Sequence, residues 1–298
     1  SSQRCITMQR TVSSELGGTF GYGALVQTLA VLSLKGGVGK TTTVLGLAGA
    51  ALDRGLSVLV VDLDPQTNAT VTLEPAATEQ TLADVLADPK RAVAAAAVGR
   101  SAWSDGVASG GLLDVLVGTG EVAGHDHPEP GRNRLGRLRT ALGRLDGNDG
   151  APGPYDLVLI DCPPSLGQLT RSGLVAADRA MLVAEPSRFA VSGVRRAFEA
   201  VQNERDAHNP ELQPLGVVVN RVRPRSAEHE YRVDELRRIF GPLVLSPVLP
   251  DRSAVEQAQG AAVPIQRWPT PGGREMSGAF DALLERVLRS RSRRTSRG

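Results

Sequence analysis

The chain has 298 residues, of which 41% are hydrophobic and 22% are charged, and its formal net charge is +2. This balance is typical of a globular domain and excludes a disordered chain or a protein whose total charge alone would attract nucleic acid. The two cysteines, Cys5 and Cys162, lie far apart, which argues against a disulfide framework, a zinc site or a bridging iron–sulfur cluster. No apolar run reaches the roughly 18 residues of a membrane span. No signal-peptide pattern opens the chain, so we expect a cytoplasmic protein.

Apolar runs alternate with amphipathic segments between two polar ends. Residues 1–27 are rich in Ser, Thr and Gly and are expected to form a flexible extension, whereas 289–298 are expected to form a basic, disordered tail. The pattern predicts strands at 28–34, 57–64, 111–119, 155–161, 179–186, 215–222 and 243–250. It predicts helices at 40–55, 81–88, 91–98, 134–145, 168–177, 191–208, 227–240 and 275–289. Residues 28–288 therefore read as one α/β domain with a doubly wound, mostly parallel sheet flanked by helices, which binds ligands at the carboxyl ends of its strands.

A glycine-rich turn, "KGGVGKTT", joins the first predicted strand to the first helix. Glycines at this position let backbone N–H groups converge on phosphate oxygens at a helix N-terminus. Lys40 would neutralise the β and γ phosphates, and the Thr41 hydroxyl would bind Mg²⁺. The loop has Leu34 where the usual phosphate-loop pattern has its first glycine, and an extra lysine, Lys35, follows. Since the chain has 34 basic residues but only three lysines, two lysines within this loop indicate a function that arginine does not replace.

Acidic residues follow two other strongly apolar strands. Asp62 and Asp64 lie in "VLVVDLDPQ", and Asp161 ends "YDLVLID". A carboxylate at a strand end beside a phosphate-binding loop is a common way to hold Mg²⁺, often through water. Together the three segments predict a site for a nucleotide and its metal.

The loop "KGGVGKTTT", the segment "VLVVDLDPQTNAT" and residues 155–187 resemble the ParA family of partition ATPases, of the deviant Walker A class that includes MinD. The resemblance covers about residues 28–288. It implies an ATPase that uses Mg²⁺ and forms a homodimer around two ATP molecules, with slow hydrolysis stimulated by a partner.

The resemblance also implies individual roles. Lys35 matches the signature lysine that reaches the partner's nucleotide, and Asp64 matches the residue that positions or activates the attacking water. With Lys40 these are the expected catalytic residues, while Thr41, Asp62 and Asp161 are the expected metal residues. The expected nucleotide contacts are Lys35, Gly36, Gly37, Val38, Gly39, Lys40, Thr41, Thr42, Asn220, Pro250 and Asp251.

ParA relatives bind DNA non-specifically and act with a ParB-like adaptor that binds centromere-like DNA. An arginine cluster follows the 215–222 segment, and a cluster of this kind can neutralise phosphates without reading bases. The predicted DNA-binding residues are Arg221, Arg223, Arg225, Arg232 and Arg252. The alternative for these arginines is a solvated helix face, and Glu230 and Asp251 occupy positions where the family pattern has basic residues.

Two other functions stay open from the sequence. A MinD-like membrane-cycling ATPase would use a terminal amphipathic helix, and "FDALLERVLRSR" (280–291) carries an apolar stripe at helical spacing. Such a stripe more often packs on its own domain. The other alternative is a nucleotide switch that acts as a scaffold without turnover. The partition function, on DNA at the nucleoid rather than on a membrane, is the prediction.

Overall fold

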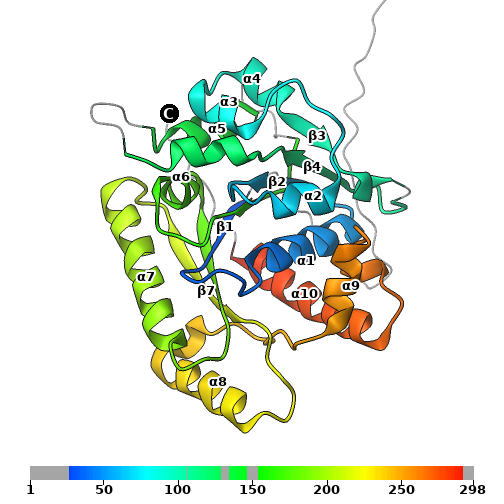
Figure 1. The fold of residues 1–298 in the computed structure, drawn as a ribbon, viewed down its shortest axis with the longest axis vertical. Coiled ribbons are helices and arrows are strands. Elements are labelled where there is room, and N and C mark those ends of the chain that lie inside the picture. The colour runs from blue at the N-terminus through cyan, green and yellow to red at the C-terminus, as the bar shows by residue number, and fades with distance from the viewer. Residues whose placement is uncertain (1–26, 106, 129–133, 146–153, 291–298) are drawn as a thin grey trace, which may run out of the picture.

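The computed structural model describes residues 27–105, 107–128, 134–145 and 154–290, and its centre is a single sheet (Figure 1). The seven strands lie in the order β3-β4-β2-β5-β1-β6-β7. All neighbours pair in parallel except β3, which runs antiparallel to β4 at one edge. The strands are β1 (Gln27–Leu32), β2 (Ser57–Asp62), β3 (Val98–Arg100), β4 (Leu112–Leu116), β5 (Leu157–Asp161), β6 (Arg179–Ala184) and β7 (Gln213–Val219). The predicted doubly wound, mostly parallel architecture is confirmed.

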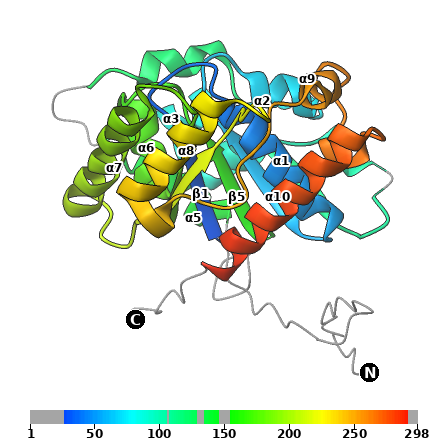
Figure 2. The same cartoon turned by 90° about the horizontal axis from the view of Figure 1, so that it is seen from below.

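Helices cover both faces of the sheet, so its inner strands are buried on both sides. They are α1 (Lys40–Asp53), α2 (Asn68–Leu73), α3 (Leu82–Ala87), α4 (Arg91–Ala96), α5 (Arg137–Leu145), α6 (Gln168–Ala176), α7 (Ala190–Ala207), α8 (Ala227–Phe240), α9 (Ser253–Gly260) and α10 (Pro271–Arg289). Successive side chains of β1 point to opposite faces: Leu29 and Val31 join the core under α1, α2, α9 and α10, whereas Ala30 and Leu32 join the core under α3–α8. Figure 2 shows α1 and α10 together on one side and α7 on the other.

The last predicted strand, 243–250, is not a strand. A short 3-10 helix, Gly241–Leu243, replaces its start, and only two isolated bridges follow, Val217 with Val244 and Val222 with Pro250. Pro247 has no N–H to donate and fixes its own φ, so a continuous ladder through this segment is blocked. The helix predicted at 91–98 also ends early, because residues 98–100 pair with β4.

The C-terminal helix α10 packs along α1 and uses the apolar stripe identified in the sequence to do so. Phe280, Leu283, Leu284, Val287 and Leu288 are all buried in the core beneath it. The ring of Phe280 lies so close to α1 that a Cβ on Gly46 would come within 2.4 Å of it. The apolar stripe is thus part of the core. No helix among the described residues has the length and apolarity to cross a membrane.

The two ends of the described fold meet at the amino edge of the sheet. The side chain of Gln27, the first residue of β1, donates to Ser290 Oγ at 2.9 Å. Arg179, the first residue of β6, donates twice to the Ser290 carbonyl oxygen, at 3.0 and 2.6 Å. Because the inner strands are parallel, this edge lies opposite the glycine-rich loop (Figure 2). Of the predicted extension (1–27) and tail (289–298), residues 1–26 and 291–298 lie outside the described residues, whereas Gln27 begins β1 and Arg289 ends α10.

Candidate nucleotide site at the carboxyl edge of the sheet

The glycine-rich loop between β1 and α1 is shaped by Gly39 and braced by Asn220. Gly39 is the N-cap of α1 and has φ +91°, a left-handed conformation that favours glycine. The buried Asn220 amide donates to the Val38 carbonyl oxygen at 2.8 Å, and a Cβ on Gly39 would lie 2.1 Å from that amide nitrogen. The loop therefore requires glycine at 39 for two independent reasons. Asn220, predicted to contact adenine, lies beneath the loop and holds its backbone.

Buried polar groups from α1, β2 and β5 meet directly behind the loop. The Thr41 hydroxyl donates to Asp161 Oδ2 at 2.6 Å, and the Lys40 side chain is buried beside them. Asp62 and Asp161 are register partners on adjacent strands and are both fully buried. Asp62 Oδ2 accepts a hydrogen bond from the Thr70 backbone N–H at 2.8 Å. The structure therefore brings together four predicted site residues from three separate segments.

These carboxyls carry an electrostatic cost that a cation would relieve. Burial raises the pKa of Asp161 to about 8, with the nearby Asp62 charge adding to the shift. Burial also raises the pKa of Asp62 to about 6. Asp161 Oδ1 is buried and has no hydrogen-bond partner among the described residues. An orphaned carboxylate oxygen beside a threonine hydroxyl suits a hard divalent cation such as Mg²⁺.

The protein groups alone do not complete such a metal site. Within the described ranges, no group of three or more His, Cys, Asp or Glu side chains is arranged to hold a metal ion. Mg²⁺ usually keeps several waters and binds through one or two protein groups together with substrate phosphates. The residues present fit that arrangement, in which the metal arrives with a nucleotide.

Asp64 lies on the turn that follows β2, near but not among the fully buried pair. Its backbone N–H donates to Asp62 Oδ1 at 3.3 Å, and its Oδ1 accepts from the Gln66 N–H at 3.0 Å. One carboxylate oxygen is thus used to fix the turn, and the residue is 6% exposed. This placement suits a residue that orients water.

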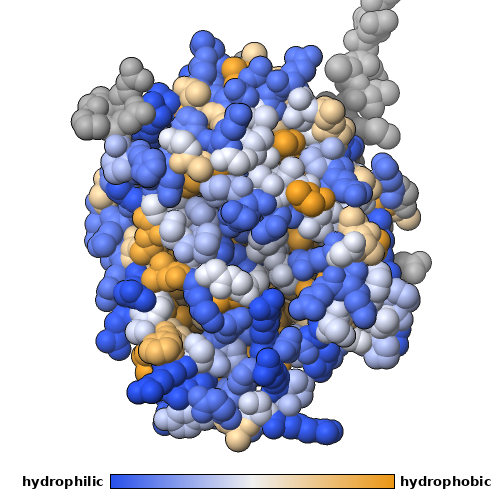
Figure 3. Space-filling view, viewed as in Figure 1, coloured by the Kyte–Doolittle hydropathy of each residue, from blue (hydrophilic) through white to orange (hydrophobic). Residues whose placement is uncertain are grey.

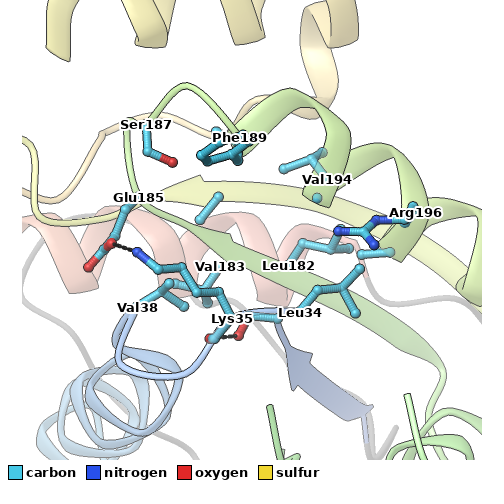
Figure 4. A pocket seen from close by; sticks show the side chains of 15 residues that line it. Leu34, Lys35, Val38, Leu182, Val183, Glu185, Ser187, Phe189, Val194 and Arg196 are labelled. Atoms are coloured by element: carbon cyan, nitrogen blue, oxygen red, sulfur yellow. Dashed lines mark hydrogen bonds and ion pairs between the residues drawn. The ribbon is translucent and has the colours of Figure 1, made fainter. Parts of the chain in front are cut away.

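Lys35 lies apart from the other lysine of the loop. Its ammonium contacts Glu185 Oε2 at 2.9 Å, beyond the end of β6, and 67% of its side chain is exposed (Figure 4). A cavity of about 220 Å³ lies between the loop and the start of α7, lined by Leu34, Leu182 and Val194 among others. The two lysines therefore point to different places: Lys40 inward, and Lys35 outward along the surface.

The remaining predicted nucleotide contacts gather beside the start of α1. Thr42, Asn220, Pro250 and Asp251 line one shallow depression. Gln259 of α9 donates to the Thr42 hydroxyl oxygen at 3.2 Å, which ties α9 to α1 at this point. Residues 249–251 lie at the end of the segment 243–250 that was wrongly predicted as a strand. The bridge between Val222 and Pro250 brings Pro250 and Asp251 to this depression.

Four of the five predicted DNA-binding arginines have acidic partners. Arg232 lies between Glu228 at 2.7 Å and Glu235 at 3.0 Å, and Arg252 forms a two-bond pair with Glu275. Arg221 and Arg223 are 3.4 Å from Glu185 and Asp251, respectively. Arg225 is exposed and has no such partner among the described residues. Most of the positive charge read from this segment is therefore offset locally.

Sequence reasoning missed three residues of the site. Thr70 holds Asp62, and its hydroxyl accepts from the Gly118 N–H at 3.0 Å. Gly118 leaves room for Asp62, because a Cβ there would lie 2.6 Å from the Asp62 carbonyl oxygen. Glu185 receives Lys35. Glu185 could have been noticed in the sequence, since it is a charged residue just past a buried strand. That Lys35 is its partner follows only from the adjacency of β1 and β6.

Known proteins are similar to this chain in sequence. A family model described as an AAA domain matches residues 26–214. The chromosome partitioning protein ParA of Caulobacter vibrioides is 34% identical over 243 residues, which cover 80% of this chain and 86% of that protein. The chain belongs to the ParA family of partition ATPases. The sporulation initiation inhibitor protein Soj of Bacillus subtilis is 31% identical over 240 residues, covering 80% of this chain and 89% of Soj.

Solved structures share the fold of this chain. The cobyrinic acid a,c-diamide synthase of Mycobacterium smegmatis, solved with ADP and magnesium, superposes with a TM-score of 0.71 at 28% identity, covering 90% of this chain and 97% of that one. The same enzyme has been solved with an ATP analogue and magnesium. This ParA-family chain is thus a member of a nucleotide-binding ATPase fold whose homologues bind adenine nucleotides with Mg²⁺.

Proposed function

We propose that this protein is an Mg²⁺-ATP-dependent partition ATPase that dimerises on ATP, binds DNA non-specifically as a dimer and leaves it after partner-stimulated hydrolysis. It would segregate plasmid or chromosomal DNA or position another cargo. The observation that supports this best is the composition of one loop: a buried Lys40 behind it and an exposed Lys35 at its front. A loop that only held its own nucleotide would not need a second, outward lysine to bind that nucleotide.

In this proposal the backbone of Gly36–Thr42 holds the phosphates and Lys40 neutralises them. The Thr41 hydroxyl and Asp161 would hold Mg²⁺, with Asp62 supporting its water shell. When bound, the metal offsets the negative charge of the phosphates and of the reacting group. The depression formed by Thr42, Asn220, Pro250 and Asp251 would receive the adenine.

Asp64 would orient the attacking water and accept its proton. Asp64→Ala is therefore expected to bind ATP and to accumulate as a dimer, because assembly persists while hydrolysis stops. Asp88→Ala, at an exposed ion pair just after the C-terminal end of α3, is the matched control and should turn over like the wild type. Rapid turnover in Asp64→Ala would remove Asp64 from the mechanism.

Dimerisation would place DNA-binding surfaces of two subunits side by side and so give binding that depends on ATP. Arg225 is the arginine in this segment best suited to a phosphate, since its charge is not offset within the described structure. A ParB-like adaptor would stimulate hydrolysis. The apolar stripe of α10 is buried in the core, so it is not available as a MinD-like membrane anchor.

Co-sedimentation with plasmid DNA and with anionic liposomes, each with and without ATP, tests the function directly. We expect pelleting with DNA only when ATP is present, and a steep loss as salt rises, since phosphate contacts release counterions. Binding to liposomes but not DNA would overturn the proposal in favour of a membrane-cycling ATPase. ATP-independent binding to DNA would refute the switch.

A further inference from the structure

The ion pair between Lys35 and Glu185 joins the loop after β1 to the segment after β6. Figure 4 shows the lysine side chain running along the loop to Glu185, at one end of the cavity beside α7. The ammonium lies 2.9 Å from Glu185 Oε2, and the Glu185 side chain is 21% exposed. Within one subunit, therefore, the outward lysine already has an anionic partner.

This contact competes with the role proposed for Lys35. If the ammonium were bonded to Glu185 and to phosphate oxygens of a second subunit's nucleotide at once, two anionic groups would lie side by side and repel each other, so dimerisation on ATP should break the pair. We propose that Glu185 is a positioning residue for Lys35: it holds the lysine on its own subunit and thereby sets how much ATP is needed to form the dimer. This inference rests on the proposed function.

The surroundings of Glu185 suit a contact that opens. Its other carboxylate oxygen lies 3.4 Å from Arg221 Nη1, so Glu185 keeps a cationic neighbour after Lys35 leaves. Both partners are reached by water, and the lysine is mostly exposed. Neither group is left buried and unpaired by the change, which would otherwise cost far more.

The expected size of the effect follows from the exposure of the pair. Exposed ion pairs contribute a factor of about 1.4 to 5 to an equilibrium. Because a dimer breaks two such pairs, removing them should lower its dissociation constant by about 2- to 25-fold. Salt screens this exposed ion pair, so the difference in dissociation constant between the variant and the wild type should shrink as ionic strength rises.

Glu185→Gln tests this, since glutamine keeps the shape and removes the charge. Analytical ultracentrifugation across an ATP titration should show the variant dimerising at lower ATP than the wild type, while both stay monomeric without ATP. Glu185→Asp, which restores a carboxylate, should return the ATP dependence toward that of the wild type. The control is Asp88→Asn, which removes the exposed 2.7 Å pair of Lys90 and should leave dimerisation unchanged.

A spectroscopic readout separates positioning from general stability. The chain has three lysines, so protein labelled with ¹³C at lysine Cε gives three signals, which Lys→Arg variants assign. In the ATP-free protein the Lys35 signal should shift in Glu185→Gln and not in Asp88→Asn, and the Lys90 signal should do the reverse.

The outcomes for this inference and for the proposed function differ. If Lys35→Ala still dimerises with ATP like the wild type, the proposed function loses its cross-subunit lysine. If Lys35→Ala behaves as expected but Glu185→Gln dimerises no better, or worse, Glu185 does not restrain the lysine and the inference is wrong. An unchanged Lys35 signal in Glu185→Gln would also overturn it.

Discussion

The buried Asn220 offers a sharp test of how the loop is held. Asn220→Ala removes the hydrogen bond of 2.8 Å to the Val38 carbonyl oxygen, and Val38 itself is buried. A buried acceptor left without its donor costs about 1–3 kcal/mol. At about 2–4 °C per kcal/mol for a chain of this order of size, the melting temperature should fall by about 2–12 °C. Because the lost bond braces the phosphate-binding loop, ATP affinity should fall as well.

Asn209 provides a matched control for this test. It is equally buried, and its amide donates to the carbonyl oxygens of Leu174 and Ala177 at 3.0 and 2.7 Å, away from the loop. Asn209→Ala should therefore lose at least as much stability in thermal and urea unfolding, yet bind ATP like the wild type in calorimetry. If both variants lose the same ATP affinity, or Asn220→Ala loses none, the bracing role is refuted.

Three further predictions follow from other contacts. Burial raises the pKa of Asp161 to about 8 and that of Asp62 to about 6. Between about pH 4 and pH 8 the native state therefore holds protons that the unfolded chain releases. Without nucleotide, the free energy of unfolding should fall as pH rises through this range. Asp161→Asn should flatten that slope in melting curves and gain less stability from Mg²⁺-ATP; an unchanged slope would contradict the assignment. Phe280→Ala should cost about 3–5 kcal/mol in urea unfolding, because the ring is 1% exposed against Gly46, and a loss near zero would mean that α10 does not depend on it. Lys35→Ala should bind ATP as a monomer in sedimentation experiments, with Lys90→Ala dimerising normally as the control.

The inner strands were predictable because burial on both faces makes their sequences continuously apolar. β2, "SVLVVD", and β5, "LVLID", are buried along their whole length, and the sequence signal is correspondingly strong. The segment at 243–250 has the same apolar character, and it was wrongly predicted as a strand. A pattern of apolar residues takes no account of the missing N–H of Pro247. The short helix α2 was missed because "NATVTL" is rich in β-branched residues, which have low helix propensity.

The residues of the candidate site also divide into those that sequence motifs predicted and those that depend on packing. The loop motif and the rule that ligands bind at strand ends predicted Thr41 and Asp161, and these side chains are in contact. Asn220 was predicted as an adenine contact, whereas its bond to the loop backbone depends on packing that a linear pattern does not contain. Glu185 requires knowing that β6 lies next to β1, which is a property of the sheet order and of no single segment.

The fastening of Gln27 and Arg179 to Ser290 has a practical consequence. Both ends of the described fold leave from one point, on the side of the molecule away from the nucleotide edge. A fluorescent reporter fused at either end would start from the back of each subunit, and a subunit immobilised through either end would present its loop to solution. Joining the two ends and reopening the chain elsewhere should also be tolerated, since the new linker would cross only a short gap.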